Sequence, residues 1–460
     1  MRIFILFLFM AAVLQSPAQS LPDSVVRKLE TGISGFRDRY HTPGIAVAII
    51  HGNDVIFSRA LGFADQEKKI PATVDYRFPV LSVSKVFTAT MAMQLRERGK
   101  LSLEDDVSRY LPEFTNGSSR KGKSGISILQ LATHTAGFAR NTHEDLLFAK
   151  QIDDWLLKRR SFAYLTPATK EELLKSLPGI RTEYAPYKLV SYGDRLYSNL
   201  GYAMLGISAE RAAGMEYASF IRKNIFEPLG MNSSGFDNER PLPALAKGYF
   251  WDDSLRVFLP TPAFQSNGAL YAGGMYASAN DFARFISFQF DTTAAAAKIL
   301  SSASRSMMAS FRIGWKPEYP YVLHEGAMLG YRCVVVYNPE VKIGWVILTN
   351  TSEFEFGRIN RYFSELLLPV YSLPAPGLQD FAGTYRLEGG ADSIRISFRD
   401  GKLYSDYPYG QDYPLTRDGN YNFKGASRGA YSVGYEFRLD IHGRLSYLNL
   451  GQLKWIRSPG

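Results

Sequence analysis

The sequence predicts an α+β protein, with a mixed α/β domain followed by a small all-β domain. Apolar strand candidates lie near both ends of the first domain, at 45–50 and 334–349, and helical segments fill its middle. This arrangement predicts one sheet built from both ends of the region, together with a helical subdomain. Beyond residue 377, short segments alternate apolar and polar residues with a period of two, which is typical of a barrel or a sandwich.

An export signal is predicted at the start of the chain. Arg2 is positively charged, residues 3–14 are almost wholly apolar, and Ser16 and Ala18 are small residues that frame a cleavage site after Ala18. We therefore expect a cleavable signal peptide over 1–18 and a periplasmic or secreted protein. The apolar run is short for a bilayer span, and an uncleaved N-terminal anchor is the alternative. No later run of 18 apolar residues follows, so we expect no stable membrane span.

A helix and a hairpin follow the signal. Apolar residues near helical spacing predict an amphipathic helix over 22–40. A short apolar strand at 45–50 turns at 52–54 and returns at 55–60. Strong helix formers predict a buried helix over 83–98, which Gly99 ends.

The rest of the first domain is mostly helical until its last strands. Residues 141–195 are long, polar and irregular, with helical pieces. The remaining helices and strands are expected at 126–132, 143–157, 169–175, 200–213, 334–337, 343–349 and 355–368.

A proline-rich segment at 369–377 predicts a linker between a domain over 21–368 and a second domain over 378–460. Strands alternating at 394–399 and 435–439 make the second domain a small barrel or sandwich. We find no internal repeat.

The composition excludes several classes of protein. With 46% apolar and 21% charged residues among 460, the chain is neither collagen-like nor wholly disordered. Cys333 is the single cysteine, so a disulfide framework is excluded, and the histidines show no metal-ligand spacing. The net charge of +9 is spread along the chain and is weak evidence for nucleic acid. We expect a small-molecule or peptide substrate, no metal, no organic cofactor and no nucleic-acid partner; the oligomeric state stays open.

Two well-known sequence motifs occur in contexts that do not match the structures they require. Residues 117–124 match the P-loop expression, but no strand precedes them and the segment is typical of a solvated loop. Residues 425–429 match the nucleophile-elbow expression around Ser427, but they lie in the β-rich tail, where a glycine-serine turn is the better interpretation.

Ser82 and Lys85 form the pair on which the functional hypothesis rests. Ser82 stands where an apolar helix begins, and residues three apart share a helix face, so Lys85 can reach the Ser82 hydroxyl. A serine becomes a good nucleophile when an adjacent base takes its proton, and a lysine desolvated in an apolar helix loses its own proton more easily. The helix start also favours developing negative charge. Taken alone, an N-cap serine with a surface lysine explains the pair equally well.

Two further motifs follow in order: Tyr197-Ser198-Asn199 before an apolar helix, and His324-Glu325-Gly326 before the last strands. With them the chain resembles the serine β-lactamase-like hydrolases: class C β-lactamases, D-alanyl-D-alanine carboxypeptidases, D-aminopeptidases and related esterases. The flanking segments 86–89, 95–107, 131–137 and 224–231 are similar as well. The resemblance implies an antiparallel sheet covered by helices, with the site between the sheet and the helical subdomain.

The resemblance also implies roles for single residues. Ser82 would be the acylated nucleophile, Lys85 would help to remove its proton, and Tyr197 would be the partner base or acid. Asn199 would bond to Lys85 and to substrate. On the last motif, Gly326 would let an edge strand approach the substrate backbone, and His324 would line the site. The backbone N–H groups of Ser82 and Ala327 would form the oxyanion hole. The loop at 271–276 would border the site, whereas His134 is expected to make a structural bond in its own loop.

His324 departs from the family pattern, because β-lactamases and carboxypeptidases carry lysine there. Histidine is mostly uncharged at neutral pH, so recognition of a substrate carboxylate at this position is weakened. His-x-Gly is typical of the esterase and D-aminopeptidase branches.

The sequence therefore predicts an exported serine hydrolase that acts through an acyl-enzyme on an ester or amide. D-amino-acid peptides, cell-wall fragments and small esters are the candidate substrates. A true class C-type β-lactamase is the alternative enzyme, and a penicillin- or cell-wall-peptide-binding sensor that acylates and stalls is the alternative from another class.

Overall fold

The fold was analysed in a computed structural model. It describes residues 21–114, 124–141, 152, 164–165, 167–183, 197–371, 377–407, 412–417, 422–425, 433–439, 445–450 and 453–458. The predicted signal peptide, the P-loop expression at 117–123, most of the irregular region after 141 and Ser427 lie outside these residues. No helix among the described residues is long and apolar enough to cross a membrane.

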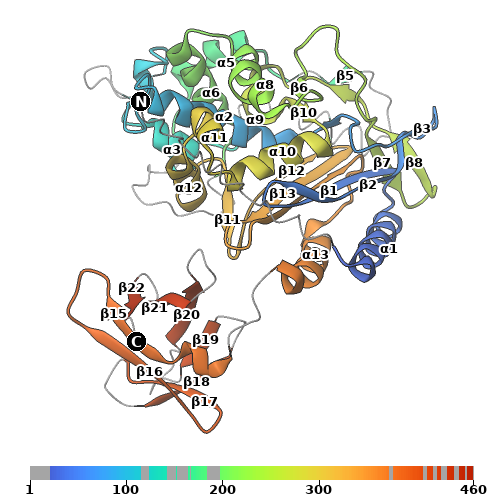
Figure 1. The fold of residues 1–460 in the computed structure, drawn as a ribbon. Helices are drawn as coiled ribbons and strands as arrows, with labels where there is room; N and C mark the ends of the chain where they lie inside the picture. The colour runs from blue at the N-terminus through green and yellow to red at the C-terminus, as the bar shows by residue number, and fades with distance from the viewer. Residues whose placement is uncertain are drawn as a thin grey trace, which may run out of the picture.

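A seven-stranded antiparallel sheet forms the centre of the first domain (Figure 1). Its middle is the pairing of the first strand with the last long one, in which Ile45 lies opposite Thr349. The predicted sheet built from both ends of the region is therefore confirmed. In order across the sheet the strands are β11 (Lys316–Glu318), β12 (Tyr321–Met328), β13 (Tyr331–Asn338), β14 (Ile343–Thr349), β1 (Gly44–His51), β2 (Asp54–Asp65) and β3 (Ile70–Pro71).

Helices cover both faces of this sheet. Neighbouring residues of a strand point to opposite faces, and in β1 Ile45 and Val47 join one apolar cluster while Ala46 and Ala48 join the other. The first cluster lies under α1 (Asp23–Arg39) and α13 (Phe356–Tyr371), which pack together (Figure 1). The second lies under α10 (Ala279–Phe290) and the helical subdomain. Burial on both faces explains why β1 and β14 are almost continuously apolar.

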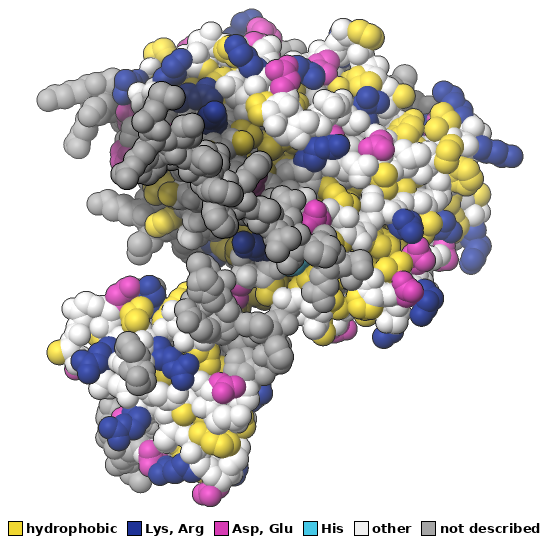
Figure 2. All heavy atoms as spheres, in the orientation of Figure 1, with side chains coloured by type: hydrophobic (Ala, Val, Ile, Leu, Met, Phe, Trp, Pro, Cys, Tyr) yellow, Lys and Arg dark blue, Asp and Glu magenta, His cyan; other side chains and the backbone are white. Residues whose placement is uncertain are grey.

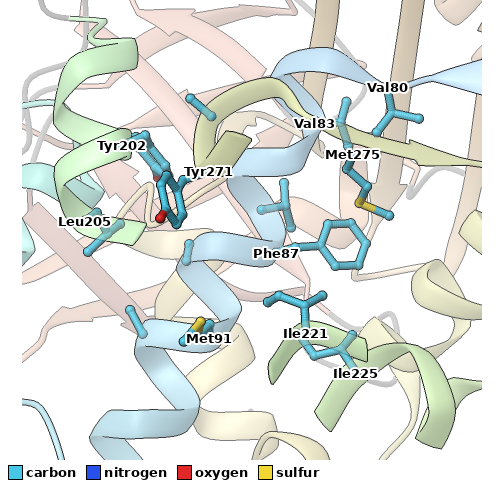
Figure 3. Close-up of a cluster of buried hydrophobic side chains, with 14 of the residues drawn as sticks. Val80, Val83, Phe87, Met91, Tyr202, Leu205, Ile221, Ile225, Tyr271 and Met275 are labelled. Carbon is cyan, nitrogen blue, oxygen red and sulfur yellow. The ribbon is translucent and has the colours of Figure 1, made fainter. Parts of the chain in front are cut away.

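The helical subdomain is organised around α2 (Ser84–Glu97), the helix predicted at 83–98. Figure 3 shows Phe87 of α2 beside Ile221 and Ile225, and Tyr202 and Leu205 of α6 (Asn199–Ala213) on the other side of α2. Because α2 packs on several sides, twelve of its fourteen residues are buried. The other helices are α3 (Ile128–Ala132), α5 (Lys170–Ser176), α7 (Tyr217–Ile221), α8 (Glu227–Leu229), α9 (Leu270–Gly273), α11 (Ala294–Ile299) and α12 (Ser302–Ser310).

Short strands complete the domain. They are β4 (Phe78–Pro79), β10 (Met275–Ala277) and β6 (Gly235–Phe236) in one sheet, β5 (Tyr164–Leu165) with β9 (Ala263–Phe264), and β7 (Tyr249–Asp252) with β8 (Val257–Pro260). Single helical turns lie at Leu81–Val83 (η1), Val107–Arg109 (η2), Leu177–Gly179 (η3), Arg222–Phe226 (η4), Asn267–Ala269 (η5) and Leu378–Phe381 (η6).

The C-terminal domain is a closed eight-stranded barrel, so the predicted all-β fold is confirmed and the barrel alternative is the right one. Figure 1 shows it apart from the first domain, beyond α13. Its interior is filled by aromatic and aliphatic side chains such as Tyr385, Phe423 and Phe437. The strands are β15 (Gly383–Leu387), β16 (Ser393–Arg399), β17 (Lys402–Ser405), β18 (Tyr413–Arg417), β19 (Asn422–Gly425), β20 (Val433–Leu439), β21 (Leu445–Leu450) and β22 (Leu453–Arg457).

The segment predicted as a linker differs at its start, because α13 continues through Pro369 to Tyr371. Residues 372–376 lie outside the described residues. On the face drawn in Figure 2, basic and acidic side chains are interspersed over the coloured surface, so the net positive charge is dispersed there.

Candidate active site

Ser82 lies in the helical turn η1, which leads directly into α2. The preceding residue, Leu81, is buried and has a φ of 52°, a left-handed backbone that is rare for a bulky residue. Such a conformation costs about 1–3 kcal/mol and persists only where the surroundings enforce it. Here Ser84 enforces it, because its Oγ donates to the Leu81 carbonyl at 2.6 Å and accepts from the Met275 N–H at 3.1 Å. The turn is thus fixed between α2 and β10.

Gly326 allows β12 to lie directly against this turn. A Cβ on Gly326 would stand 2.4 Å from the Val80 carbonyl oxygen and 2.6 Å from the Cys333 Sγ. The Cys333 thiol itself donates to the same carbonyl at 3.0 Å, and burial raises its pKa. Gly326 was expected to let substrate backbone approach, whereas in the structure it lets the chain just before Ser82 approach. Since β11 pairs only as far as Leu323, the part of β12 that follows is a sheet edge among the described strands.

Lys85 is completely buried beneath Ser82. Its Nζ lies 3.1 Å from the Ser82 Oγ and donates to the Ala272 carbonyl at 2.7 Å. Burial lowers the pKa of Lys85 well below its usual value, and the positive charge of Arg140 lowers it further. Lowering the pKa of a lysine favours its neutral amine, which is the form that can accept the serine proton.

Tyr197 covers Lys85 and is itself held by His134. The Lys85 Nζ lies 4.9 Å from the centre of the Tyr197 ring, and the His134 ring stacks on that ring at 4.4 Å. His134 Nδ1 accepts a hydrogen bond from the Ser198 N–H at 3.0 Å, so its partner lies in the Tyr-x-Asn motif. Burial and the charge of Lys85 lower the pKa of His134 well below 6.5, which keeps its ring neutral. His134 therefore orients Tyr197, a role that the sequence analysis did not foresee.

His324 lies on the other side of Tyr197, with 6.5 Å between the two ring centres. It is 8% exposed, and burial together with the charge of Lys85 lowers its pKa to about 3. Its Nδ1 lies 2.9 Å from the Glu325 carbonyl oxygen. The histidine that replaces the family lysine is therefore uncharged at any ordinary pH.

Asn199 is the first residue of α6, and Ser198 caps that helix by accepting from the Gly201 N–H at 2.9 Å. The Asn199 side chain donates to the Asn141 Oδ1 at 2.7 Å. The expected bond from Asn199 to Lys85 is not present among the described residues, because Lys85 is engaged by Ser82 and Ala272.

A cavity of about 230 Å³ opens over Ser82. Three of the predicted residues line it, namely Ser82, Asn199 and Ala327, whereas Lys85 and His324 are buried beneath its surface. Arg140 and Asn141 also line it, and neither was predicted; both follow the loop at 131–137, which was the signal that could have pointed to them. The remaining lining residues are Leu81, Ile152, Pro167, Phe264, Ser266, Ala269, Ala272, Gly273 and Met328. Ala272 and Gly273 belong to the loop at 271–276 that was expected to border the site.

The arrangement has the parts needed for nucleophilic catalysis: an accessible hydroxyl, a buried amine within hydrogen-bond reach of it, and a phenol held over that amine. No group of three or more metal-ligating side chains that could hold an ion is found in the part of the chain that the structure describes.

Comparison with known proteins gives a consistent match for the first domain. A family model described as Beta-lactamase matches residues 28–368. Penicillin-binding protein 4* of Bacillus subtilis is 26% identical over 71% of this chain and 72% of its own length. Beta-lactamase-like protein 2 of Dictyostelium discoideum is 27% identical over 58% of this chain, and the match spans 44% of that longer protein.

Solved structures with the same fold cover one or both domains. An octameric penicillin-binding protein homologue from Pyrococcus abyssi superposes with a TM-score of 0.62 at 24% identity, over 94% of this chain and all of that one. A β-lactamase/D-alanine carboxypeptidase from Pseudomonas syringae gives a TM-score of 0.59 at 19% identity, over 76% of this chain and all of that one. At these identities the likeness shows the fold alone.

Proposed function

The chain belongs to the Beta-lactamase family, whose chemistry is that of serine hydrolases acting through an acyl-enzyme, and from this premise we propose that it hydrolyses an ester or amide with Ser82 as the nucleophile. The observation that carries the proposal is the contact between Ser82 and Lys85. Their reacting atoms lie 3.1 Å apart, and Lys85 is completely buried. A surface lysine that merely accompanies an N-cap serine would remain exposed and protonated.

The first half of the proposed reaction is acylation. The Ser82 Oγ attacks the carbonyl carbon of the substrate, and its proton passes to the Lys85 Nζ. The negative charge that develops on the carbonyl oxygen is stabilised by the backbone N–H groups of Ser82 and Ala327, both of which line the cavity. Collapse of the intermediate breaks the bond to the alcohol or amine, which leaves with a proton delivered from Lys85 through Tyr197.

The second half is deacylation. Water attacks the ester carbonyl on Ser82, gives its proton to the Tyr197–Lys85 pair, and releases the acid while Ser82 regains its hydrogen. Tyr197 suits this role because burial lowers the pKa values of His134 and His324, so these rings are weak bases and do not compete for its proton.

We propose a D-amino-acid peptide, a cell-wall fragment or a small ester as the substrate, met outside the cytoplasm by a protein exported through the signal at 1–18. The names of the relatives, penicillin-binding protein and D-alanine carboxypeptidase, support a cell-wall peptide. Efficient β-lactam hydrolysis is the second candidate, and the neutral His324 in place of lysine disfavours it.

Intact-protein mass spectrometry with a fluorophosphonate tests the proposal. We expect one adduct on the native protein, none on Ser82→Ala, and full labelling of Ser427→Ala, which removes the serine of the rejected nucleophile-elbow expression. Labelling that survives Ser82→Ala and disappears in Ser427→Ala would overturn the assignment. Turnover of a short-chain ester and of a D-amino-acid amide then separates a hydrolase from a protein that acylates and stalls.

A further inference from the structure

Arg140 gives the cavity over Ser82 an unbalanced positive charge. It is the single basic residue among the described lining residues of that cavity, and none of them is acidic. Its side chain is exposed, and its guanidinium carbon lies 5.0 Å from the centre of the Tyr197 ring. Within the described part of the chain, no carboxylate or other hydrogen-bond acceptor engages the guanidinium. A cation in a concave site without an acidic partner is a candidate for binding a substrate anion.

The backbone fixes Arg140 at this place. Its carbonyl oxygen accepts from the Asn199 N–H at 2.7 Å and from the Leu200 N–H at 3.4 Å, so the residue is held against the first turn of α6. α6 is fifteen residues long, and the partial positive charge at its start reinforces the field of the guanidinium. That field reaches the catalytic groups, since the charge of Arg140 lowers the pKa values of both Lys85 and His134.

Among the described residues of the site, two other positions could supply a positive charge, and neither presents one to the cavity. His324 occupies the place where the family pattern has lysine, but it is buried and neutral. Lys85 is beneath the floor of the cavity and engaged by Ser82 and Ala272. A substrate anion that enters this cavity therefore meets Arg140 first.

We infer that Arg140 binds a carboxylate on the acyl part of the substrate, the part that stays attached to Ser82 after the leaving group has gone. The inference rests on the proposed acyl-enzyme. The planar guanidinium matches a carboxylate with two parallel hydrogen bonds, and a lone arginine suits one such group better than a phosphate, which draws on several cations. The acyl part is assigned because Arg140 and Ser82 line the same cavity, in which a chain tethered to Ser82 remains.

Two p-nitrophenyl esters of matched length test the inference: the monoester of adipic acid, which has a carboxylate at the far end of its acyl chain, and the ester of heptanoic acid, which has a methyl group there. The measured quantity is the ratio of kcat/KM for the anionic ester to that for the neutral one. We expect Arg140→Gln to lower this ratio about 10- to 100-fold, as for the loss of hydrogen bonds to a charged group. Arg140→Lys keeps the positive charge but cannot make two parallel hydrogen bonds, so its ratio should lie between those of the native protein and Arg140→Gln.

Taking a ratio removes effects common to both esters, including any change in the pKa of Lys85. Arg181→Gln makes the same change in net charge at an exposed site that does not line the cavity, and the ratio should stay as in the native protein. A third ester, with a heptanoyl group on 3-carboxy-4-nitrophenol, puts the carboxylate on the leaving group. Its ratio to heptanoyl p-nitrophenol should not respond to Arg140→Gln.

If Arg140→Gln leaves the ratio of kcat/KM for the adipate ester to that for the heptanoate ester unchanged, the inference is overturned. If only the ratio for the third ester falls, Arg140 binds a carboxylate on the leaving group, and the assignment to the acyl part is overturned. Failure of the proposed function looks different, because Ser82→Ala would then leave hydrolysis of every ester and the fluorophosphonate adduct intact.

Discussion

The floor and the rim of the cavity differ in how much water surrounds their charged and titratable groups. In the floor, Lys85, His134, His324 and Tyr197 are between 0% and 9% exposed. At the rim, Arg140 is exposed and Asn141 is half-buried. Burial lowers the pKa values of Lys85, His134 and His324, and groups with shifted pKa values suit proton transfer. At the rim, the exposed guanidinium of Arg140 presents a positive charge, which is what recognition of an anion requires. In this site the groups suited to proton transfer are buried, and the group suited to substrate recognition is exposed.

The largest expected effect on activity comes from removing the amine of Lys85 from the floor of the cavity. Lys85→Ala should lower kcat/KM for a neutral ester by about 10³-fold or more, because the proton of Ser82 would lose its acceptor. Tyr197→Phe should also cause a large loss, and the double variant should lose much less than the product of the two, since groups acting as one unit are non-additive. The measurement is kcat/KM for the four proteins. Multiplicative losses would show that Lys85 and Tyr197 act separately.

Gly326→Ala tests how closely the floor is packed. The added methyl group would stand 2.4 Å from the Val80 carbonyl oxygen, so the turn before Ser82 or the edge of β12 has to move. We expect the free energy of unfolding to fall by about 1–3 kcal/mol, as for overpacked cores, together with a clear loss of activity. Chemical denaturation and ester turnover measure both. Gly357→Ala is the matched control, because a methyl group there meets nothing within 4 Å and lies in helix α13; equal losses in both variants would contradict the account.

The buried histidines should make stability depend on pH. The folded-state pKa values of His134 and His324 lie below the usual 6.5, so the unfolded chain binds their protons first as pH falls. Stability from these two groups is therefore present above about pH 6.5 and is lost below it, by up to ~1.4 kcal/mol per pH unit for each histidine. His324→Gln should flatten this slope between pH 6.5 and 5 in urea titrations. A slope identical to that of the native protein would mean that His324 has the same pKa in the folded and unfolded states.

The smallest expected effect links the rim to the floor. Because the charge of Arg140 helps to lower the pKa of Lys85, Arg140→Gln should raise that pKa. Less of the lysine is then neutral at a given pH, so the acidic limb of kcat/KM for the neutral heptanoyl ester should move to higher pH. Arg181→Gln should leave the limb in place at 0.15 M salt, where distant exposed charges are screened. A shift of the same size in both variants would make the effect one of net charge.

Contacts that follow from local periodicity could be predicted from the sequence. The spacing of Ser82 and Lys85 on one helical turn predicted the contact that the structure shows, and alternating segments predicted an all-β C-terminal domain. The sheet built from both ends of the first domain was also predictable, because β1 and β14 are almost continuously apolar.

Contacts between distant segments could not be predicted in the same way. Nothing in the loop around His134 reveals that its ring stacks on Tyr197. The loop at 131–137 points to the region of Arg140, but the sequence does not reveal that Arg140 lines the same cavity as Ser82. The family pattern implied a hydrogen bond between Asn199 and Lys85. In the structure the Asn199 amide donates instead to Asn141, a residue that was not among the predicted site residues. Gly326 was expected to face substrate backbone, whereas the structure places it against the chain just before Ser82, a contact between segments that are far apart in the sequence.

The pairing of β1 with β14 has a consequence for how the protein is made. Because Ile45 lies opposite Thr349, the middle of the sheet cannot close until the ribosome has synthesised nearly all of the first domain. Ser82 and Lys85 emerge early but acquire their buried surroundings late, since β12 arrives with the same final stretch. Folding of this domain therefore has a high contact order and should be slow, whereas the barrel that follows is assembled mainly from neighbouring hairpins.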